Sequence, residues 1–280
     1  MSYHDLFQEF AKLSRQREAI AEAIGHLNLE SRAARFLCVD IGSNDGVLTE
    51  QVMQQVGKRS ERVQIYAFEP DVAAYKELAR RFKASANVMI DNLDFRSWTA
   101  KYSASLEGQI DLVLNSHVIY HFKREEWERV FNQCDKLLAP NGVHIVIVDS
   151  NKQPFSDLPQ TAQLRKTLDR KLQGAPKVKA YSEIVDGDEV ERFLYGQSMR
   201  YTPYFIEQPI VILNDEKAAE NLAKVFSLIF KYDTKAILLR ARDIVDYYIN
   251  TCRRGSEIHF PRFQDMFVIK KGKHPELTFV

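Results

Sequence analysis

The sequence has few cysteines and no excess of either charge. Its three cysteines, Cys38, Cys134 and Cys252, are odd in number and widely spaced, which excludes a disulfide framework and the ligand spacing of a zinc site. We therefore expect no metal, and we interpret Cys38, which lies in an apolar run, as a packed thiol. The 39 basic and 38 acidic residues leave a net charge of +1 without a basic stripe, which argues against nucleic acid or a membrane surface as a partner.

Long apolar runs are also missing from the sequence. No stretch is long enough to cross a membrane and no signal peptide opens the chain, so we expect a cytoplasmic protein. Of the 280 residues, 45% are hydrophobic, which is enough for the core of one large domain.

The most informative stretch is residues 36–46, with the sequence FLCVDIGSNDG. Its apolar start, Phe36–Val39, is typical of a buried parallel strand. Gly42 and Gly46 then bracket a tight turn, and helical spacing returns over Val47–Val56. A strand, a glycine turn and a helix in this order put a phosphate or a small polar ligand beside a helix N-terminus.

The turn lacks the middle glycine of dinucleotide sites. Those sites use G-x-G-x-x-G, whereas this turn is G-x-x-x-G with Asn44 at its centre, a residue that tolerates left-handed backbone geometry. Asp40, just before the first glycine, would repel a diphosphate and hold an ammonium group. S-adenosylmethionine carries an ammonium and no phosphate, so we expect this cofactor rather than NAD. The residues expected to bind it at the turn are Asp40, Gly42, Asn44 and Gly46.

Three more apolar runs, Val63–Phe68, Ile110–Asn115 and Val143–Val148, predict strands. Helical spacing predicts a helix at Pro70–Phe82, where proline is tolerated at the first position, and another at Arg124–Leu138, stopped by the Pro-Asn-Gly that follows. Alternating strands and helices predict a parallel sheet wrapped by helices.

Acidic residues follow the second and third strands, where ligands of open parallel sheets bind. Glu69 can accept hydrogen bonds from both hydroxyls of a ribose. The third strand region, Val88–Asp94, also ends in an acid. We expect Asp94 to accept from an adenine amino group and Phe95 to stack on the ring, with Asp91 as the alternative acid.

Polar residues also follow the fourth strand. We expect Ser116 and His117 to lie near the cofactor, and Tyr120 and His121 near the molecule that reacts with it. The last two are the candidate catalytic residues, because either could act as a base toward a phenol or an alcohol. His144 lies inside a strand and is interpreted as a packing residue.

Both ends of the chain break this alternation. Residues 3–27 have helical spacing and predict a helix that either packs on the domain or forms a lid, with Tyr3 and Phe7 facing the ligand. Residues 151–200 are polar and suggest a helical cap over the substrate. The other expected elements are helices at 161–172, 183–194, 216–232 and 234–252, a strand region at 200–213 and an edge strand at 265–270.

Four motifs occur in a set order: Asp40–Gly46, then Phe68-Glu69-Pro70, then Asp94, then Asp111-Leu112-Val113. Over residues 36–150 they resemble class I S-adenosylmethionine-dependent methyltransferases. The resemblance implies an enzyme with an α/β, Rossmann-like doubly wound fold. The sheet would have seven mostly parallel strands, and the last, in the closing FQDMFVIKK, would lie antiparallel beside the fifth. An N-terminal helix and a helical cap insertion would be added to it.

We interpret the whole chain, 1–280, as a single methyltransferase domain. Its parts would be an N-terminal helical lid (1–30), a cofactor-binding core (36–150), a substrate cap (151–200) and C-terminal elements that complete the sheet (201–280). Residues 115–123, NSHVIYHFK, are similar to small-molecule N-methyltransferases of the histamine methyltransferase type, which implies a small nitrogenous substrate.

Aromatic faces attract cations, so aromatic residues could line a pocket for a cationic substrate, together with one or two acids from 183–191. The residues expected to bind substrate are Tyr3, Phe7, Phe155, Tyr181, Tyr201 and Tyr204. The leading hypothesis is methyl transfer to a nitrogen of a small molecule. The alternatives are aminocarboxypropyl transfer from the same cofactor, O-methylation of a phenol, and a binding module without catalysis.

Overall fold

The computed structural model describes residues 10–29, 35–58, 60–150, 161–176 and 185–273. The chain divides into two compact units. The sheet unit comprises residues 17–149, 184–206 and 265–280, and the helical unit comprises residues 1–16, 150–183 and 207–264. Within the described ranges, no helix is both long enough and apolar enough to cross a membrane.

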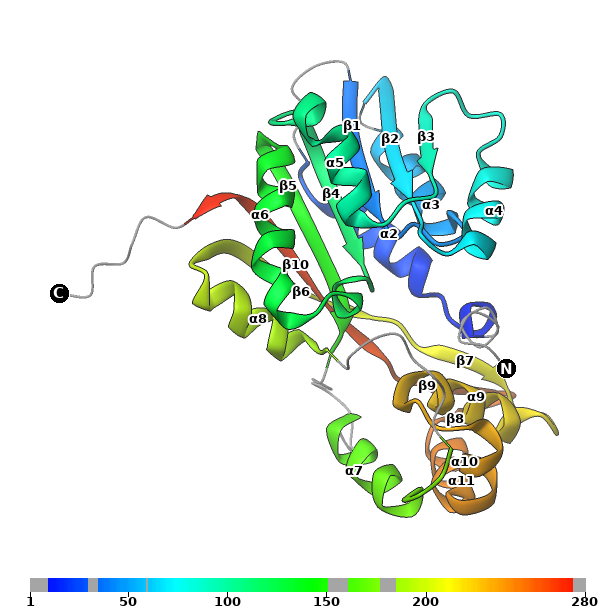
Figure 1. The fold of residues 1–280 in the computed structure, drawn as a ribbon. Coiled ribbons are helices and arrows are strands. Elements are labelled where there is room, and N and C mark those ends of the chain that lie inside the picture. The colour runs from blue at the N-terminus through cyan, green and yellow to red at the C-terminus, as the bar shows by residue number, and fades with distance from the viewer. Residues whose placement is uncertain (1–9, 30–34, 59, 151–160, 177–184, 274–280) are drawn as a thin grey trace. The chain divides into compact units, whose positions relative to one another are not determined.

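A seven-stranded sheet lies at the centre of the sheet unit, in the order β3-β2-β1-β4-β5-β10-β6 (Figure 1). Its strands are β1 (Arg35–Ile41), β2 (Arg62–Phe68), β3 (Val88–Asp91), β4 (Ile110–Ser116), β5 (Leu138–Asp149), β6 (Met199–Glu207) and β10 (Phe263–Lys273). The first five pair in parallel and β10 runs against them. This confirms the expected seven strands. The strand order reverses between β1 and β4, the position where such sheets bind ligands.

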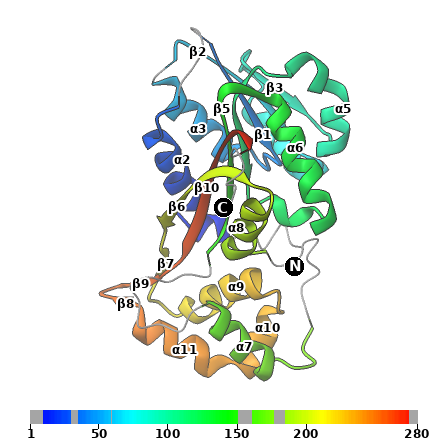
Figure 2. The same cartoon turned by 90° about the vertical axis from the view of Figure 1, so that its left-hand side faces the viewer.

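Helices cover both faces of this sheet (Figure 2). α2 (Gln16–His26), α3 (Val47–Gly57) and α4 (Val72–Arg81) pack on one face, and α5 (Phe95–Leu106), α6 (Trp127–Leu137) and α8 (Gly187–Gly196) on the other. Successive strand residues point to opposite faces of the sheet. Phe36 and Cys38 of β1 therefore pack in the core under α2, α3 and α4, while Leu37 and Val39 pack in the core under α5, α6 and α8. Cys38 is a buried free thiol, as expected.

The helical unit has its own apolar core. Its helices are α7 (Thr161–Lys171), α9 (Ala218–Phe230), α10 (Thr234–Arg240) and α11 (Arg242–Thr251). A small antiparallel sheet in the order β7-β9-β8 completes the unit, from Ile210–Leu213, Glu257–Phe260 and Arg253–Arg254. Ser14, in the N-terminal segment of this unit, forms a bridge to Ile210, and its hydroxyl donates to the side-chain oxygen of Gln208.

The closing strand is not the edge strand that the sequence predicts. β10 lies between β5 and β6, so it is an interior strand, and β6 forms the edge. The continuous apolar run Met266–Ile269 is buried throughout, as expected for a strand covered on both faces. β6 contains Pro203, a residue that edge strands tolerate because it has no N–H to donate.

Capping residues shift several predicted helix starts. α4 begins two residues after the expected proline, because Asp71 is its N-cap and accepts from two N–H groups of the first turn. Asp94 does not end a strand; it is the N-cap of α5 and accepts from the backbone N–H of Ser97 at 2.7 Å. The helix expected at 183–194 likewise begins only after its N-cap, Asp186.

The Pro-Asn-Gly predicted to stop a helix lies inside β5, which begins at Leu138. The pairing of β4 with β5 is irregular between Ile110 and Leu112. A Cβ on Gly142 would collide with the carbonyl oxygen of Ile110. Glycine here permits a close approach of the two backbones, a common role for glycine at an irregular strand pair.

Further corrections concern the C-terminal part. The helix expected at 234–252 is two helices, which meet at Ala241, whose φ of −132° and ψ of 25° are not helical. The strand region expected at 200–213 is divided between β6 and β7, which belong to different sheets. The short strands β8 and β9 have no counterpart among the expected elements.

Trp98 on α5 offers a test of the core. Its side chain is fully buried and its ring stacks on Phe68 at a centroid distance of 4.8 Å. Trp98→Ala should lower the free energy of unfolding by about 3–5 kcal/mol, because it removes the stack and leaves a cavity. Trp98→Phe should cost clearly less, since it keeps a ring and removes an indole N–H that has no partner among the described residues. Urea unfolding measures both losses, and equal losses would argue against the stack as the stabilising contact.

Candidate active site

The loop 42–46 joins β1 to α3 and has an unusual backbone. Alternate residues are left-handed, with φ of 64° at Gly42, 51° at Asn44 and 78° at Gly46. There is also no space for side chains: a Cβ on Gly42 would lie 2.7 Å from Val118, and one on Gly46 would lie 2.7 Å from Leu78. Glycine is therefore required at both ends of the loop, and asparagine is one of the few other residues that fits its centre.

Asp40 lies at the end of β1, beneath this loop, and is only 4% exposed. The hydroxyl of Thr49 on α3 donates to its carboxylate at 2.5 Å, and the hydroxyl of Ser43 donates to its backbone oxygen at 2.9 Å. Burial raises the pKa of Asp40 to about 6, against the lowering effect of the hydroxyl hydrogen bonds. Near pH 7 the end of β1 therefore carries a buried negative charge.

Glu69, just after β2, binds the loop from the neighbouring strand. One carboxylate oxygen accepts from the backbone N–H of Asn44 at 2.9 Å, and the other accepts from that of Asp71 at 2.9 Å. The side chain is buried. Two carboxylates, Asp40 and Glu69, thus lie at the ends of adjacent parallel strands, as the sequence predicted, and Glu69 also fixes the backbone of the loop.

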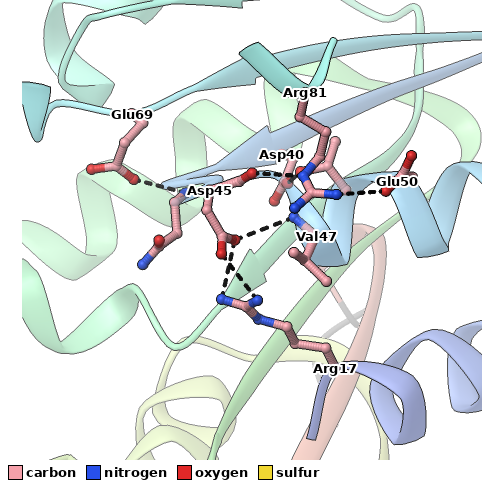
Figure 3. A network of polar contacts seen from close by, with 9 residues as sticks. Arg17, Asp40, Asp45, Val47, Glu50, Glu69 and Arg81 are labelled. Carbon is pink, nitrogen blue, oxygen red and sulfur yellow. Dashed lines mark hydrogen bonds and ion pairs between the residues drawn. The ribbon is translucent and has the colours of Figure 1, made fainter. Parts of the chain in front are cut away.

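Two arginines hold Asp45, the fourth residue of the loop (Figure 3). Arg17 of α2 forms a two-pronged ion pair with its carboxylate, at 3.1 Å for each contact. Arg81 of α4 donates from Nε to the backbone oxygen of Asp45 at 2.9 Å and from Nη1 to Glu50 at 2.8 Å. Sequence analysis missed Arg17 and Arg81, because single basic residues on amphipathic helices carry no signal that separates them from surface residues.

These contacts bear on which ligand fits the loop. A phosphate-binding loop offers free backbone N–H groups and cations. Here the N–H groups of residues 43, 44, 46 and 47 donate to Phe68, Glu69, Ser43 and Asp45 respectively. Both nearby arginines are engaged with acids. The donor set therefore fits a cationic cofactor without phosphates better than a dinucleotide.

The residues expected near adenine differ in their surroundings. Asp94 is exposed, and the hydrogen bond from the Ser97 backbone lowers its pKa. Phe95 is buried, with its ring edge-on to Phe122 at 5.6 Å. The alternative acid, Asp91, is paired with Lys101 at 2.7 Å. Of these two acids, Asp91 therefore has a lysine partner and Asp94 has none among the described residues.

The residues after β4 bring together the candidate catalytic side chains. Ser116 ends the strand, and His117 follows with a left-handed φ of 58°, a conformation that is uncommon outside glycine and often marks functional sites. A 3₁₀ turn over Ile119–His121 then carries Tyr120 and His121, whose ring centroids are 4.9 Å apart. The rings of His117 and Tyr120 are 6.2 Å apart. Tyr120 is half-buried and His121 is exposed.

Two further polar residues lie in the sheet itself. His144 is buried in β5 against the ring of Phe131, and burial lowers its pKa to about 3, so it is neutral and acts as a packing residue, as predicted. Asn115 on β4 is fully buried, and neither polar atom of its amide has a partner among the described residues. Sequence analysis gave Asn115 no role, because a lone asparagine in an apolar strand forms no motif.

Of the residues expected to bind substrate, Tyr3, Phe7, Phe155 and Tyr181 lie outside the described ranges. Tyr204 is exposed on β6. Tyr201 packs edge-on against Phe267 at 5.9 Å and also borders an open hollow of about 430 Å³. The other residues that border this hollow are Asp188, Glu191, Arg192 and Tyr195 of α8.

Known proteins share this domain and fold. Residues 39–144 match a family model described as a methyltransferase domain, and no curated protein matches the chain. The YcgJ protein from Bacillus subtilis has a TM-score of 0.53 at 13% identity, over 91% of this chain and 99% of its own. A putative sarcosine dimethylglycine methyltransferase from Galdieria sulphuraria has a TM-score of 0.52 at 12% identity, over 92% and 86%. The mycolic acid cyclopropane synthase CmaA1, complexed with SAH and CTAB, has a TM-score of 0.51 at 14% identity, over 91% and 84%.

At these identities the solved structures establish the fold, and the family model establishes the domain. The glycine turn, the two carboxylates and the strand order agree with both. Residues 39–144 therefore match a methyltransferase domain, and the sheet in which they lie has a fold similar to that of solved S-adenosylmethionine-dependent methyltransferases.

Proposed function

We propose that this enzyme methylates a nitrogen atom of a small molecule. The observation that carries the proposal is the pair of buried carboxylates, Asp40 and Glu69, at the ends of adjacent strands, beside a loop whose N–H groups at residues 43, 44, 46 and 47 are already bonded. This arrangement suits a cofactor that has an ammonium group and a ribose. The residues that would hold the cofactor are Asp40, Gly42, Asn44, Gly46, Glu69, Asp94, Phe95, Ser116 and His117.

S-adenosylmethionine, when bound, supplies a methyl group activated by a sulfonium. The protein supplies binding and orientation: Asp40 attracts the ammonium, and Glu69 accepts from the ribose hydroxyls. Holding donor and acceptor at reacting distance can account for about 7–11 kcal/mol of the barrier. The aromatic rings after β4 favour a cationic sulfonium at that position.

A nitrogen acceptor is supported by the groups that follow β4. A neutral amine needs no strong base, only a path for its proton after transfer. His121 is exposed and its ring lies beside that of Tyr120, so it can pass a proton to water. The likeness of residues 115–123 to small-molecule N-methyltransferases points the same way.

The charge on Asp40 gives a pH-dependent prediction for cofactor binding. The ionised carboxylate binds the ammonium, and its pKa in the free protein is about 6. The Kd for S-adenosylmethionine should therefore stay nearly constant from pH 7.5 to 6.5 and rise below pH 6, by at most about tenfold per pH unit. Isothermal titration measures this dependence. Asp40→Asn should bind more weakly at pH 7 and lose the rise, whereas the exposed Asp246→Asn should behave as wild type.

The charge of Asp40, which should favour cofactor binding, should lower the stability of the ligand-free fold. An acid whose folded pKa exceeds its unfolded value of 3.8 destabilises the fold where it is ionised, above about pH 6, and has no effect where both states are protonated. Asp40→Asn should therefore raise the free energy of unfolding of the ligand-free protein at pH 7.5, by up to about 3 kcal/mol. The gain should vanish near pH 3.5. A loss of stability at pH 7.5 in urea unfolding would contradict this account of Asp40.

Product analysis with a panel of small amines and phenols tests the reaction itself. An amine substrate should yield S-adenosylhomocysteine, and His121→Ala should lower kcat by about tenfold or less, because proton release can proceed through water. Loss of a required base would instead cost about 10²–10⁴-fold and would favour a phenol. Methylthioadenosine as the product would overturn methyl transfer in favour of aminocarboxypropyl transfer.

A further inference from the structure

The ion pair between Arg17 and Asp45 joins an N-terminal helix to the glycine loop (Figure 3). Both side chains are largely buried, with 17% of the Arg17 side chain and 12% of the Asp45 side chain exposed. The two guanidinium nitrogens each contact a different carboxylate oxygen at 3.1 Å. A two-pronged pair of this kind fixes orientation as well as charge, and burial protects it from screening by salt.

Asp45 has a second local function that does not depend on Arg17. Its carboxylate also accepts from the backbone N–H of Val47 at 3.3 Å, at the start of α3, and its backbone oxygen accepts from Arg81. Removal of Arg17 would leave these two contacts in place. The start of α3 should therefore persist without Arg17, while the carboxylate loses the partner that sets its direction.

The loop conformation needs stabilising contacts from other segments, because its backbone is left-handed at Gly42, Asn44 and Gly46. Glu69 and Arg81, which hydrogen-bond to the loop, belong to the matched methyltransferase domain, residues 39–144. Arg17, which pairs with Asp45 of the loop, lies on a helix that precedes this domain in the chain. If the loop adopts other conformations without Arg17, the apparent affinity for a ligand falls in proportion to the fraction that remains competent.

We propose that Arg17 is a positioning residue for the cofactor. Its ion pair with Asp45 holds the loop 42–46 in the conformation that binds S-adenosylmethionine, so the packing of α2 and the binding of cofactor stabilise each other. The proposal rests on the cofactor assigned to the proposed function and adds a determinant from outside the methyltransferase domain. Because the coupling is reciprocal, cofactor binding should also steady α2.

Titration calorimetry of the full chain with S-adenosylmethionine tests the proposal. Arg17→Gln should raise the Kd by about tenfold, the size expected when one charge-assisted hydrogen-bonded pair is lost. Arg17→Lys should recover part of the affinity, because it restores the charge without the fork. Arg80→Gln is the matched control, since Arg80 pairs with Glu77 on the exposed side of α4, and it should leave the Kd unchanged.

A double-mutant cycle identifies the partner. Asp45→Asn should weaken binding to a similar extent, and the Arg17→Gln/Asp45→Asn protein should be no weaker than either single variant. Additive losses would overturn the pair as the source of the effect. Thermal unfolding, measured in parallel, separates a purely structural role: a lower midpoint with an unchanged Kd in Arg17→Gln would also overturn the proposal.

Hydrogen exchange gives a local readout of α2 beside the global unfolding midpoint. Amides of residues 17–26 should gain protection when cofactor binds the wild type and should not gain it in Arg17→Gln. Equal gains in both proteins would count against the coupling. If the wild type binds no S-adenosylmethionine, the proposed function fails together with this inference; if the wild type and Arg17→Gln bind it equally well, only the role of Arg17 fails.

Discussion

The left-handed backbone of the loop 42–46 is the constraint on which the site depends. Such a loop cannot be held by regular secondary structure, so its groups bond to side chains from elsewhere. Glu69 comes from the end of β2, Arg81 from α4 and Arg17 from α2. These contacts hold the loop in one arrangement without a bound ligand, and such preorganisation favours tight and specific binding by a small number of contacts.

A buried negative charge lies at the end of the strand that precedes this loop. The hydroxyls of Thr49 and Ser43 stabilise the ionised form of Asp40 only in part, because burial still raises its pKa to about 6. The ionised Asp40 thus lowers the stability of the ligand-free fold, at a position where a cationic ligand would offset its charge; such destabilising groups are common at functional sites. The same chemical feature that weakens the empty fold would make the occupied one stronger.

Much of the fold could be predicted because the sheet strands are continuous apolar runs, and the glycine turn because only glycine fits its ends. The place of β10 beside β5 was predicted only by the family resemblance; its own pattern predicted an edge strand, since an apolar run shows that a strand is buried but not which strands flank it. Asp94 was expected at the end of a strand, but it caps α5, which depends on local hydrogen bonding that the strand prediction ignored; its role toward adenine stays a prediction.

The candidate site was predictable where residues lie close together in the sequence. Asp40, the glycines and Glu69 follow directly from strand ends, and the structure brings them together. Arg17 and Arg81 reach the loop across 28 and 36 positions of the chain, and ion pairs over such separations leave no periodic trace. The roles of His121, Tyr120 and the substrate aromatics depend on a bound substrate and stay predictions.

The position of β10 beside β5 has a consequence for how the chain is made. The residues that carry the methyltransferase motifs end near β5, but the strand that covers the free edge of β5 comes from residues 263–273. During synthesis, β5 would emerge with an unpaired backbone edge and apolar side chains on both faces, which is a template for association with other chains. The sheet can be completed only after more than a hundred further residues have been added. Throughout this interval the edge of β5 has no partner strand, which is the period of greatest exposure to association with other chains.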